Sequence, residues 1–131
     1  MSIFGAIGIA STGLTAHQKW LDAISDNLAN MDNATSTSEP AFQAKYVIAQ
    51  ANESGGGVSV TGIALGDAAG RVVYEPANPL ADAEGNVRYP DVEQADQMTQ
   101  LIMAQRGYQA NAAVVDRAKE TYQAALQIGR S

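Results

Sequence analysis

The stretch IFGAIGIASTGLTAHQKWLDAISDNLANM, residues 3–31, predicts a long helix because its apolar and small residues recur at alternating intervals of four and three. That spacing is the heptad seam of a helix that packs lengthwise on another helix. The seam positions are Ile3, Ile7, Ala10, Leu14, His17, Leu21, Ile24, Leu28 and Met31. Glycines at positions 5, 8 and 13 weaken the first half by up to ~1 kcal/mol each relative to alanine. This helix therefore needs a packing partner.

A second periodic stretch occupies residues 91–129 and begins with a capping-box pattern, in which Gln94 stands three residues after Asp91. Each side chain of such a pair can bond the other's backbone N–H, so the pattern predicts a helix start at Asp91. Only Gly107 interrupts the stretch, and no proline does. Its seam positions are Met98, Leu101, Gln105, Tyr108, Ala112, Val115, Lys119, Tyr122, Leu126 and Gly129.

The chain between these stretches has a different composition. It begins with a loop rich in Ser, Thr and Asn at residues 33–40. Three short β-like runs follow, at residues 44–49, 57–63 and 71–74. Three prolines, Pro76, Pro79 and Pro90, then exclude a long regular element between about residues 75 and 90. The middle of the chain is predicted to be a small, irregular, partly β insert.

The predicted fold is mainly α, with long N- and C-terminal helices packed as a coiled coil and a small β-containing insert between them. The chain divides into an N-terminal helix at 1–31, an insert at 32–90 and a C-terminal helix at 91–131. The two seams bury few large side chains, whereas ordering two long helices costs much conformational entropy. Two interpretations remain open: ends that order on association with other chains, or an antiparallel helical hairpin in a stable monomer.

Composition excludes several classes of function. With 131 residues the chain forms one domain, and 46% apolar residues favour a folded protein. A net charge of −6 disfavours nucleic-acid binding, which needs clustered positive charge. The absence of Cys excludes disulfides and thiolate metal sites, and a single His excludes a His-cluster metal site.

The uncharged N-terminal stretch suggests a leader or a membrane span, but both interpretations are weak. The first basic residue is Lys19, whereas a signal peptide has a positively charged start. Seven Gly, Ser and Thr residues interrupt the roughly 20 apolar residues that a membrane span requires. We expect no cleaved leader and no span.

For each residue that could take part in catalysis or metal binding, a structural role is the preferred interpretation. His17 lies on the seam with no acidic or nucleophilic neighbour in the sequence, so we expect a packed or interfacial histidine. Asp22 and Asp26 share one helical face and are expected to be solvated. The segment at 82–86 lacks calcium-ligand spacing and is expected to be a polar turn. We expect no catalytic residue, no cofactor and no metal site, although a hydrolase using His17 stays open as a minor alternative.

Three ordered motifs resemble those of bacterial flagellar axial proteins. The stretch SDNLAN at residues 25–30 is similar to a signature that ends their N-terminal helix, and AQRGYQAN at 104–111 is similar to one in their C-terminal helix. Between them, VYEPANPLADAEGNVRYPDV at 73–92 resembles a segment of the short proximal-rod (FlgC) family. Asn78 and Asn86 depart from the His and Tyr of that segment. The resemblance covers essentially the whole chain.

The resemblance implies a structural subunit of the basal-body rod, in the periplasm, exported by the flagellar type III apparatus. It implies terminal axial helices that pack with other copies and other rod proteins into the tubular drive shaft, which transmits torque and encloses the export channel. The expected assembly residues are Ile7, Leu14, Leu21, Ile24, Leu28, Met98, Leu101, Tyr108, Val115, Tyr122 and Leu126. The family-motif residues are Asn27, Leu28, Ala29, Asn30, Arg106, Tyr108, Gln109, Ala110 and Asn111. The alternative is an autonomous coiled-coil adaptor or export chaperone.

Overall fold

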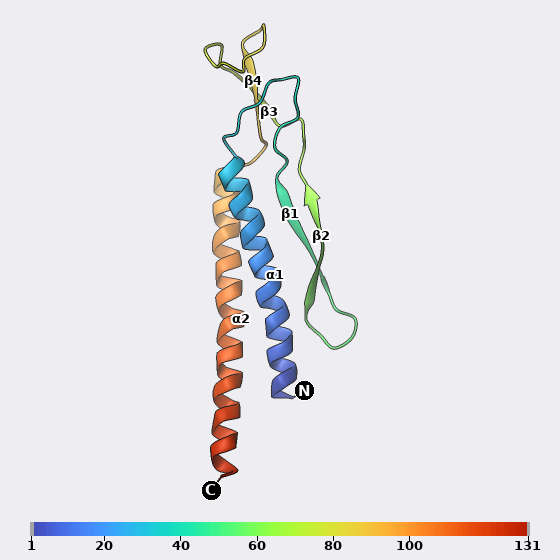
Figure 1. The fold of residues 1–131 in the computed structure, drawn as a ribbon, viewed down its shortest axis with the longest axis vertical. Helices are drawn as coiled ribbons and strands as arrows, with labels where there is room; N and C mark the ends of the chain where they lie inside the picture. Colours follow the sequence, from blue (N-terminus) through green and yellow to red (C-terminus); the bar gives the residue numbers. More distant parts are fainter. Residues whose placement is uncertain (1, 131) are drawn as a thin grey trace.

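Two antiparallel helices and a β-hairpin form the elongated body of the molecule, and a second, shorter hairpin caps one end (Figure 1). The computed structural model describes residues 2–130, so Met1 and Ser131, at the ends of the predicted divisions, lie outside the described residues. Helix α1 spans Ile3–Asn30 and helix α2 spans Gln94–Ile128. The predicted helix–insert–helix order is confirmed.

Helix α1 begins and ends close to the predicted residues. The Ser2 hydroxyl accepts a hydrogen bond from the Gly5 N–H at 3.1 Å, which satisfies one of the donors that a helix start leaves unpaired. The last residue is Asn30, one residue before the predicted end. The amide of Asn30 donates to the Asp26 carbonyl at 2.8 Å, and Asn33 donates to the Asn30 side chain at 2.7 Å. These polar contacts stabilise the C-terminal end of α1.

The predicted start of α2 is wrong by three residues. The N-cap position is Glu93, in an extended conformation and without a side-chain capping bond, so Asp91 and Gln94 form no capping box. Burial explains the difference: Pro90 and Val92, on either side of Asp91, are buried, and this packing keeps residues 90–93 out of the helix. Helix α2 then continues without interruption to Ile128.

Two antiparallel hairpins make up the insert. Strands β1 (Lys45–Ala51) and β2 (Val58–Leu65) pair with a bulge between Ile48 and Ala49. Strands β3 (Arg71–Tyr74) and β4 (Asn86–Tyr89) form the end cap. The three β-like runs are confirmed, but β4 was not expected. Only four residues long, β4 fits between the turn at Gly85 and Pro90, so the prolines exclude a long element without excluding a short strand.

Small and polar residues form the contact line between α1 and α2. A Cβ built on Gly13 would lie 2.5 Å from Asn111 Oδ1, and one on Gly107 would lie 2.1 Å from His17 Nε2. The two backbones therefore approach closely where each glycine lies opposite a polar side chain. Ala10 and Ala104 are buried on the same two helices. Helix packing inside the chain thus depends on close approach rather than on large apolar side chains.

The predicted α2 seam is displaced from this line by one residue. The residues that face α1 are Gln97, Ala104, Gly107 and Asn111, each immediately before a predicted seam position. Large side chains of the predicted seam consequently flank the contact: Met98 is 44% exposed and Leu126 is 51% exposed. The predicted helical period of α2 is correct. The residues that pack on α1, however, are the small or polar residues that precede the large seam residues in the sequence.

Candidate assembly surface and the Asn27 junction

Asn27 joins three elements of the fold at one buried side chain, which is 1% exposed. Its Nδ2 donates to the Lys45 carbonyl and to Gln97 Oε1, both at 3.0 Å. Its Oδ1 accepts from the Lys45 N–H at 2.7 Å. Asn27, Gln97 and Lys45, which we call the Asn27 junction, thereby connect α1, α2 and the start of β1. All of the polar groups of the asparagine amide that face the junction are engaged.

Gln97 is the residue of this junction that the sequence pattern missed. It is 3% exposed and follows the first turn of α2, where the seam predicted Met98 instead. Burial of an amide costs free energy unless it is hydrogen-bonded, and the bond from Asn27 meets that need. Two polar residues far apart in sequence give no periodic signal, so pattern analysis of either helix alone cannot find this pair.

An ion pair supports the junction at its rim. Lys45 Nζ pairs with the Asp26 carboxylate, one residue before Asn27. The two side chains remain 37% and 46% exposed, so solvent screens the attraction. Asp22 lies one turn earlier and accepts from the Gln18 amide at 3.0 Å, in keeping with the expected solvated face. The two aspartates thus have separate partners, Gln18 and Lys45.

Large apolar side chains remain on the surface of α2 and form the candidate assembly surface. Tyr108 is 37% exposed and Tyr122 is 41% exposed. The Tyr122 ring meets the Phe4 ring edge to face, with centroids 5.5 Å apart. We define the assembly surface by the exposed expected residues Met98, Tyr108, Tyr122 and Leu126. Exposed apolar side chains gathered along one helix are a feature of many protein interaction surfaces.

The other expected assembly residues lie closer to the interior. Ile24 is buried, at 1% exposure. The remainder are half-buried: Ile7, Leu14, Leu21, Leu28, Leu101 and Val115. Leu14 and Tyr108 line the same shallow groove between α1 and α2. The chain therefore uses part of the predicted set internally and leaves the remainder accessible.

The motif residues have two different environments. Asn27 and Asn111 face inward at the helix contact, and Asn111 also donates to the Gly107 carbonyl at 2.9 Å. The exposed motif residues are Ala29, Arg106, Tyr108, Gln109 and Ala110. The α1 signature is thus explained largely by Asn27 and Asn30, whereas the exposed α2 residues make no contact that explains their presence.

The end cap is held by polar contacts around Glu75. Its carboxylate accepts from the Asn78 amide and from the Tyr89 hydroxyl, both at 2.9 Å. The Asn78 bond, more than the Tyr89 bond, lowers the pKa of Glu75 below its ordinary value of 4.5. Arg71 lies over the Tyr89 ring, 5.2 Å from its centroid. Asn78, which departs from the family pattern, is therefore a structural residue of the cap.

The segment at 82–86 is a polar turn, as predicted. The Asp82 carboxylate accepts from the backbone N–H groups of Glu84 and Asn86, at 3.0 and 2.9 Å. It also accepts from the Thr37 hydroxyl at 2.8 Å. The Asn86 bond is the largest cause of a lowered Asp82 pKa. One carboxylate oxygen, Oδ1, holds the turn, and the other, Oδ2, connects the turn to the loop at Thr37.

His17 is the packed, interfacial histidine that the sequence predicts. Its Nδ1 lies 2.7 Å from the Gly13 carbonyl oxygen, and its ring faces Gly107 across the helix contact. Among residues 2–130, no three His, Asp or Glu side chains gather as metal ligands would. Within the same range, neither helix is apolar enough over sufficient length to cross a membrane.

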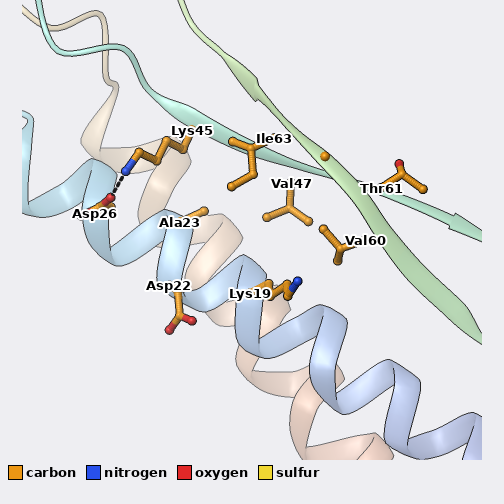
Figure 2. Close-up of a pocket in the computed structure, with 10 residues that line it drawn as sticks. Lys19, Asp22, Ala23, Asp26, Lys45, Val47, Val60, Thr61 and Ile63 are labelled. Carbon is orange, nitrogen blue, oxygen red and sulfur yellow. Dashed lines mark hydrogen bonds and ion pairs between the residues drawn. The ribbon is translucent and has the colours of Figure 1, made fainter.

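A shallow groove between α1 and the β1–β2 hairpin is the other notable surface feature (Figure 2). Its apolar part is formed by Ala23, Val47, Val60 and Ile63, and charged residues of α1 form its rim. Figure 2 shows the Lys45–Asp26 pair at one end of the groove and Lys19 at the other.

Comparison with known proteins defines the class. Residues 7–35 match the family described as flagella basal body rod protein, and residues 83–128 match the C-terminal region of the flagellar basal body rod FlgEFG proteins. The two matched segments contain the two sides of the Asn27–Gln97 contact. The two terminal segments of the chain are thus similar to those of flagellar basal-body rod proteins.

Whole-chain relatives give the particular family. The flagellar basal-body rod protein FlgC of Escherichia coli O6:H1 is 36% identical over 99% of this chain and 100% of its own length. FlgC of Salmonella typhimurium is 35% identical with the same coverage, and that of Bacillus subtilis is 29% identical. The chain belongs to the FlgC family, a structural component of the flagellar basal-body rod.

Proposed function

We propose that this chain is a proximal-rod subunit that assembles through its terminal helices into the tubular shaft of the basal body. As part of the rod, the subunit lies in the periplasm, transmits motor torque and contributes to the wall of the export channel. It reaches its position through the flagellar type III export apparatus and then contacts other copies and other rod proteins. The chain acts as a structural element and not as an enzyme.

The exposed apolar row on α2 is the observation that supports this proposal. Tyr108 and Tyr122 lie two heptads apart, Leu126 follows Tyr122 after four residues, and each of the three is more than a third exposed. A helical neighbour that inserts between them would remove this surface from water, at about 25 cal/mol for each Å² buried. Coiled-coil packing is thus proposed between subunits, while small residues serve the contact within the chain.

An autonomous adaptor or export chaperone is the second candidate, and the helix contact argues against it. A self-sufficient coiled coil buries its large apolar residues between its own helices. Here the internal line consists largely of Ala10, Gly13, Ala104, Gly107 and polar partners. The large residues remain available to several neighbours, as a tubular assembly requires.

The proposal is tested by the motility of bacteria in which the gene for this protein is replaced by a gene for one of its variants. Leu126→Asp places a charge in the assembly surface at an exposed position, so the isolated chain should keep its fold while rod completion fails. Gln123→Asp, at another exposed position of the same helix, is the matched control and should leave motility intact. Normal motility of the Leu126→Asp strain would contradict the proposal.

A further inference from the structure

Two buried polar atoms beside strand β4 make no hydrogen bond to any of residues 2–130. They are Thr35 Oγ1 and Arg88 Nε, on side chains that are otherwise half-buried. Buried polar groups in proteins are nearly always bonded, either to the protein or to an ordered water molecule, because a hydrogen bond left unmade in a buried site costs free energy. A partner for these two atoms is therefore expected.

The two side chains lie on the same face of one β-bridge. The Thr35 N–H donates to the Arg88 carbonyl at 2.8 Å, and the Arg88 N–H donates to the Thr35 carbonyl at 2.9 Å. Residues that exchange both bonds in this way have Cα atoms about 5.5 Å apart, and their side chains project from one face. The two unbonded atoms therefore belong to neighbouring side chains.

The guanidinium group of Arg88 is fixed in position by two carbonyl oxygens. Its Nη1 donates to Ala69 at 2.7 Å, and its Nη2 donates to Thr37 at 2.8 Å. In the planar guanidinium the Nε–H and the Nη2 group share one edge. Because Nη2 reaches Thr37, the Nε–H faces the same segment of the chain, residues 35–37. The unbonded donor is thus directed toward the side of the bridge where Thr35 lies.

We propose that an internal water molecule bridges Arg88 Nε and Thr35 Oγ1. The water accepts a hydrogen bond from the Arg88 Nε–H and donates one to the Thr35 oxygen. Buried waters typically serve polar groups that have no protein partner. Together with this water, Arg88 connects strand β4 to the loop at residues 33–40 and to the turn at residues 66–70. The site is a property of the folded chain and does not depend on the proposed role in the rod.

Water fits this site better than a small anion such as chloride. The guanidinium already bonds two carbonyl oxygens, which carry partial negative charge. The carboxylate of Asp82 accepts from the hydroxyl of Thr37, only two residues from Thr35. These oxygens would repel an anion, whereas a water molecule can donate as well as accept.

Nuclear magnetic resonance of the full chain labelled with ¹⁵N tests the proposal. We expect a cross-peak between the Arg88 Nε–H and a long-lived water, and slower hydrogen exchange of this proton than of the Nε–H of Arg71, an exposed residue. Thr35→Ser keeps the hydroxyl and should keep the cross-peak. Thr35→Val removes the hydroxyl, so the cross-peak should disappear and the Tm should fall by roughly 2–6 °C.

Thr61→Val is the matched control, because Thr61 is exposed on strand β2, and it should leave both the cross-peak and the Tm unchanged. If Thr35→Val does not fold, the wild-type and Thr35→Ser spectra decide the question. A crystal structure at a resolution that shows ordered waters, with crystals soaked in bromide, identifies the bound species. A direct bond between Nε and Oγ1 without water would overturn the proposal, as would a bromide ion at the site. A cross-peak that persists in folded Thr35→Val would do the same.

Discussion

At Asn27 one amide side chain determines how the backbone of a strand meets two helices. It completes a pair of hydrogen bonds with Lys45 that resembles the pairing of a neighbouring strand, and it holds Gln97 of the opposite helix. An asparagine is the short side chain that offers both a donor and an acceptor at this reach. The residue that leads the family motif on α1 is therefore a junction between elements rather than a surface contact.

Loss of this amide should be costly. In Asn27→Ala the Lys45 N–H and C=O and the Gln97 side chain lose partners in a buried site, so we expect the free energy of unfolding to fall by about 2–4 kcal/mol. Asn52→Ala in the hairpin loop is the control, with an expected change within about 0.5 kcal/mol. Urea unfolding measures both. Equal losses in the two variants would remove the special role assigned to Asn27.

Close approach at Gly107 gives a second prediction at the residue scale. An added methyl group would clash with the His17 ring, so Gly107→Ala should destabilise the chain by about 1–3 kcal/mol. His17→Ala removes the obstacle, so the double variant should be more stable than the sum of the single effects predicts. A double-mutant cycle in thermal unfolding measures this coupling. Strict additivity would show that the two residues do not meet.

The elements differ in how far the sequence determines them. The periods predict α1 to within one residue and α2 to within three, because an apolar stripe at helical spacing persists over many turns. The junction could not be predicted in the same way, since Asn27, Lys45 and Gln97 belong to three elements and have no common period. The start of α2 was missed for a related reason. Burial of Pro90 and Val92, a tertiary effect, outweighs the local capping pattern at Asp91.

The end cap formed by β3 and β4 should be sensitive to acid. Hydrogen bonds, first from Asn78, lower the pKa of Glu75 below 4.5, and the Asn86 N–H, first among several donors, lowers that of Asp82 below 3.8. A carboxylate with a lowered folded-state pKa contributes stability above its ordinary pKa. That contribution is lost as the pH falls through the lowered value, because the unfolded chain then binds more protons.

We therefore expect the Tm to fall between pH 6 and pH 3, and to fall less in Glu75→Gln, which cannot be protonated. Glu53→Gln, in the hairpin loop and far from the cap, should show the same fall as the wild type. Thermal unfolding followed by circular dichroism at the two pH values gives the comparison. The same Tm change in Glu75→Gln and the wild type would contradict the role of Glu75.

For the whole molecule, one arrangement serves two kinds of contact. Small and polar residues hold α1 and α2 together inside the chain, and the large apolar residues of α2 stay on its surface. The FlgC relatives, matched over nearly the whole length, are named as basal-body rod proteins. We infer that the heptad pattern of α2 serves contacts between subunits of the rod more than the fold of the isolated chain.

A cryo-electron microscopy map of purified basal bodies, at a resolution that shows side chains, tests this conclusion most directly. We expect Met98, Tyr108, Tyr122 and Leu126 to be buried against helices of neighbouring subunits, while the Asn27–Gln97 contact is retained within each chain. A rod in which these four side chains face solvent, with neighbours joined only through the β3–β4 cap, would contradict it.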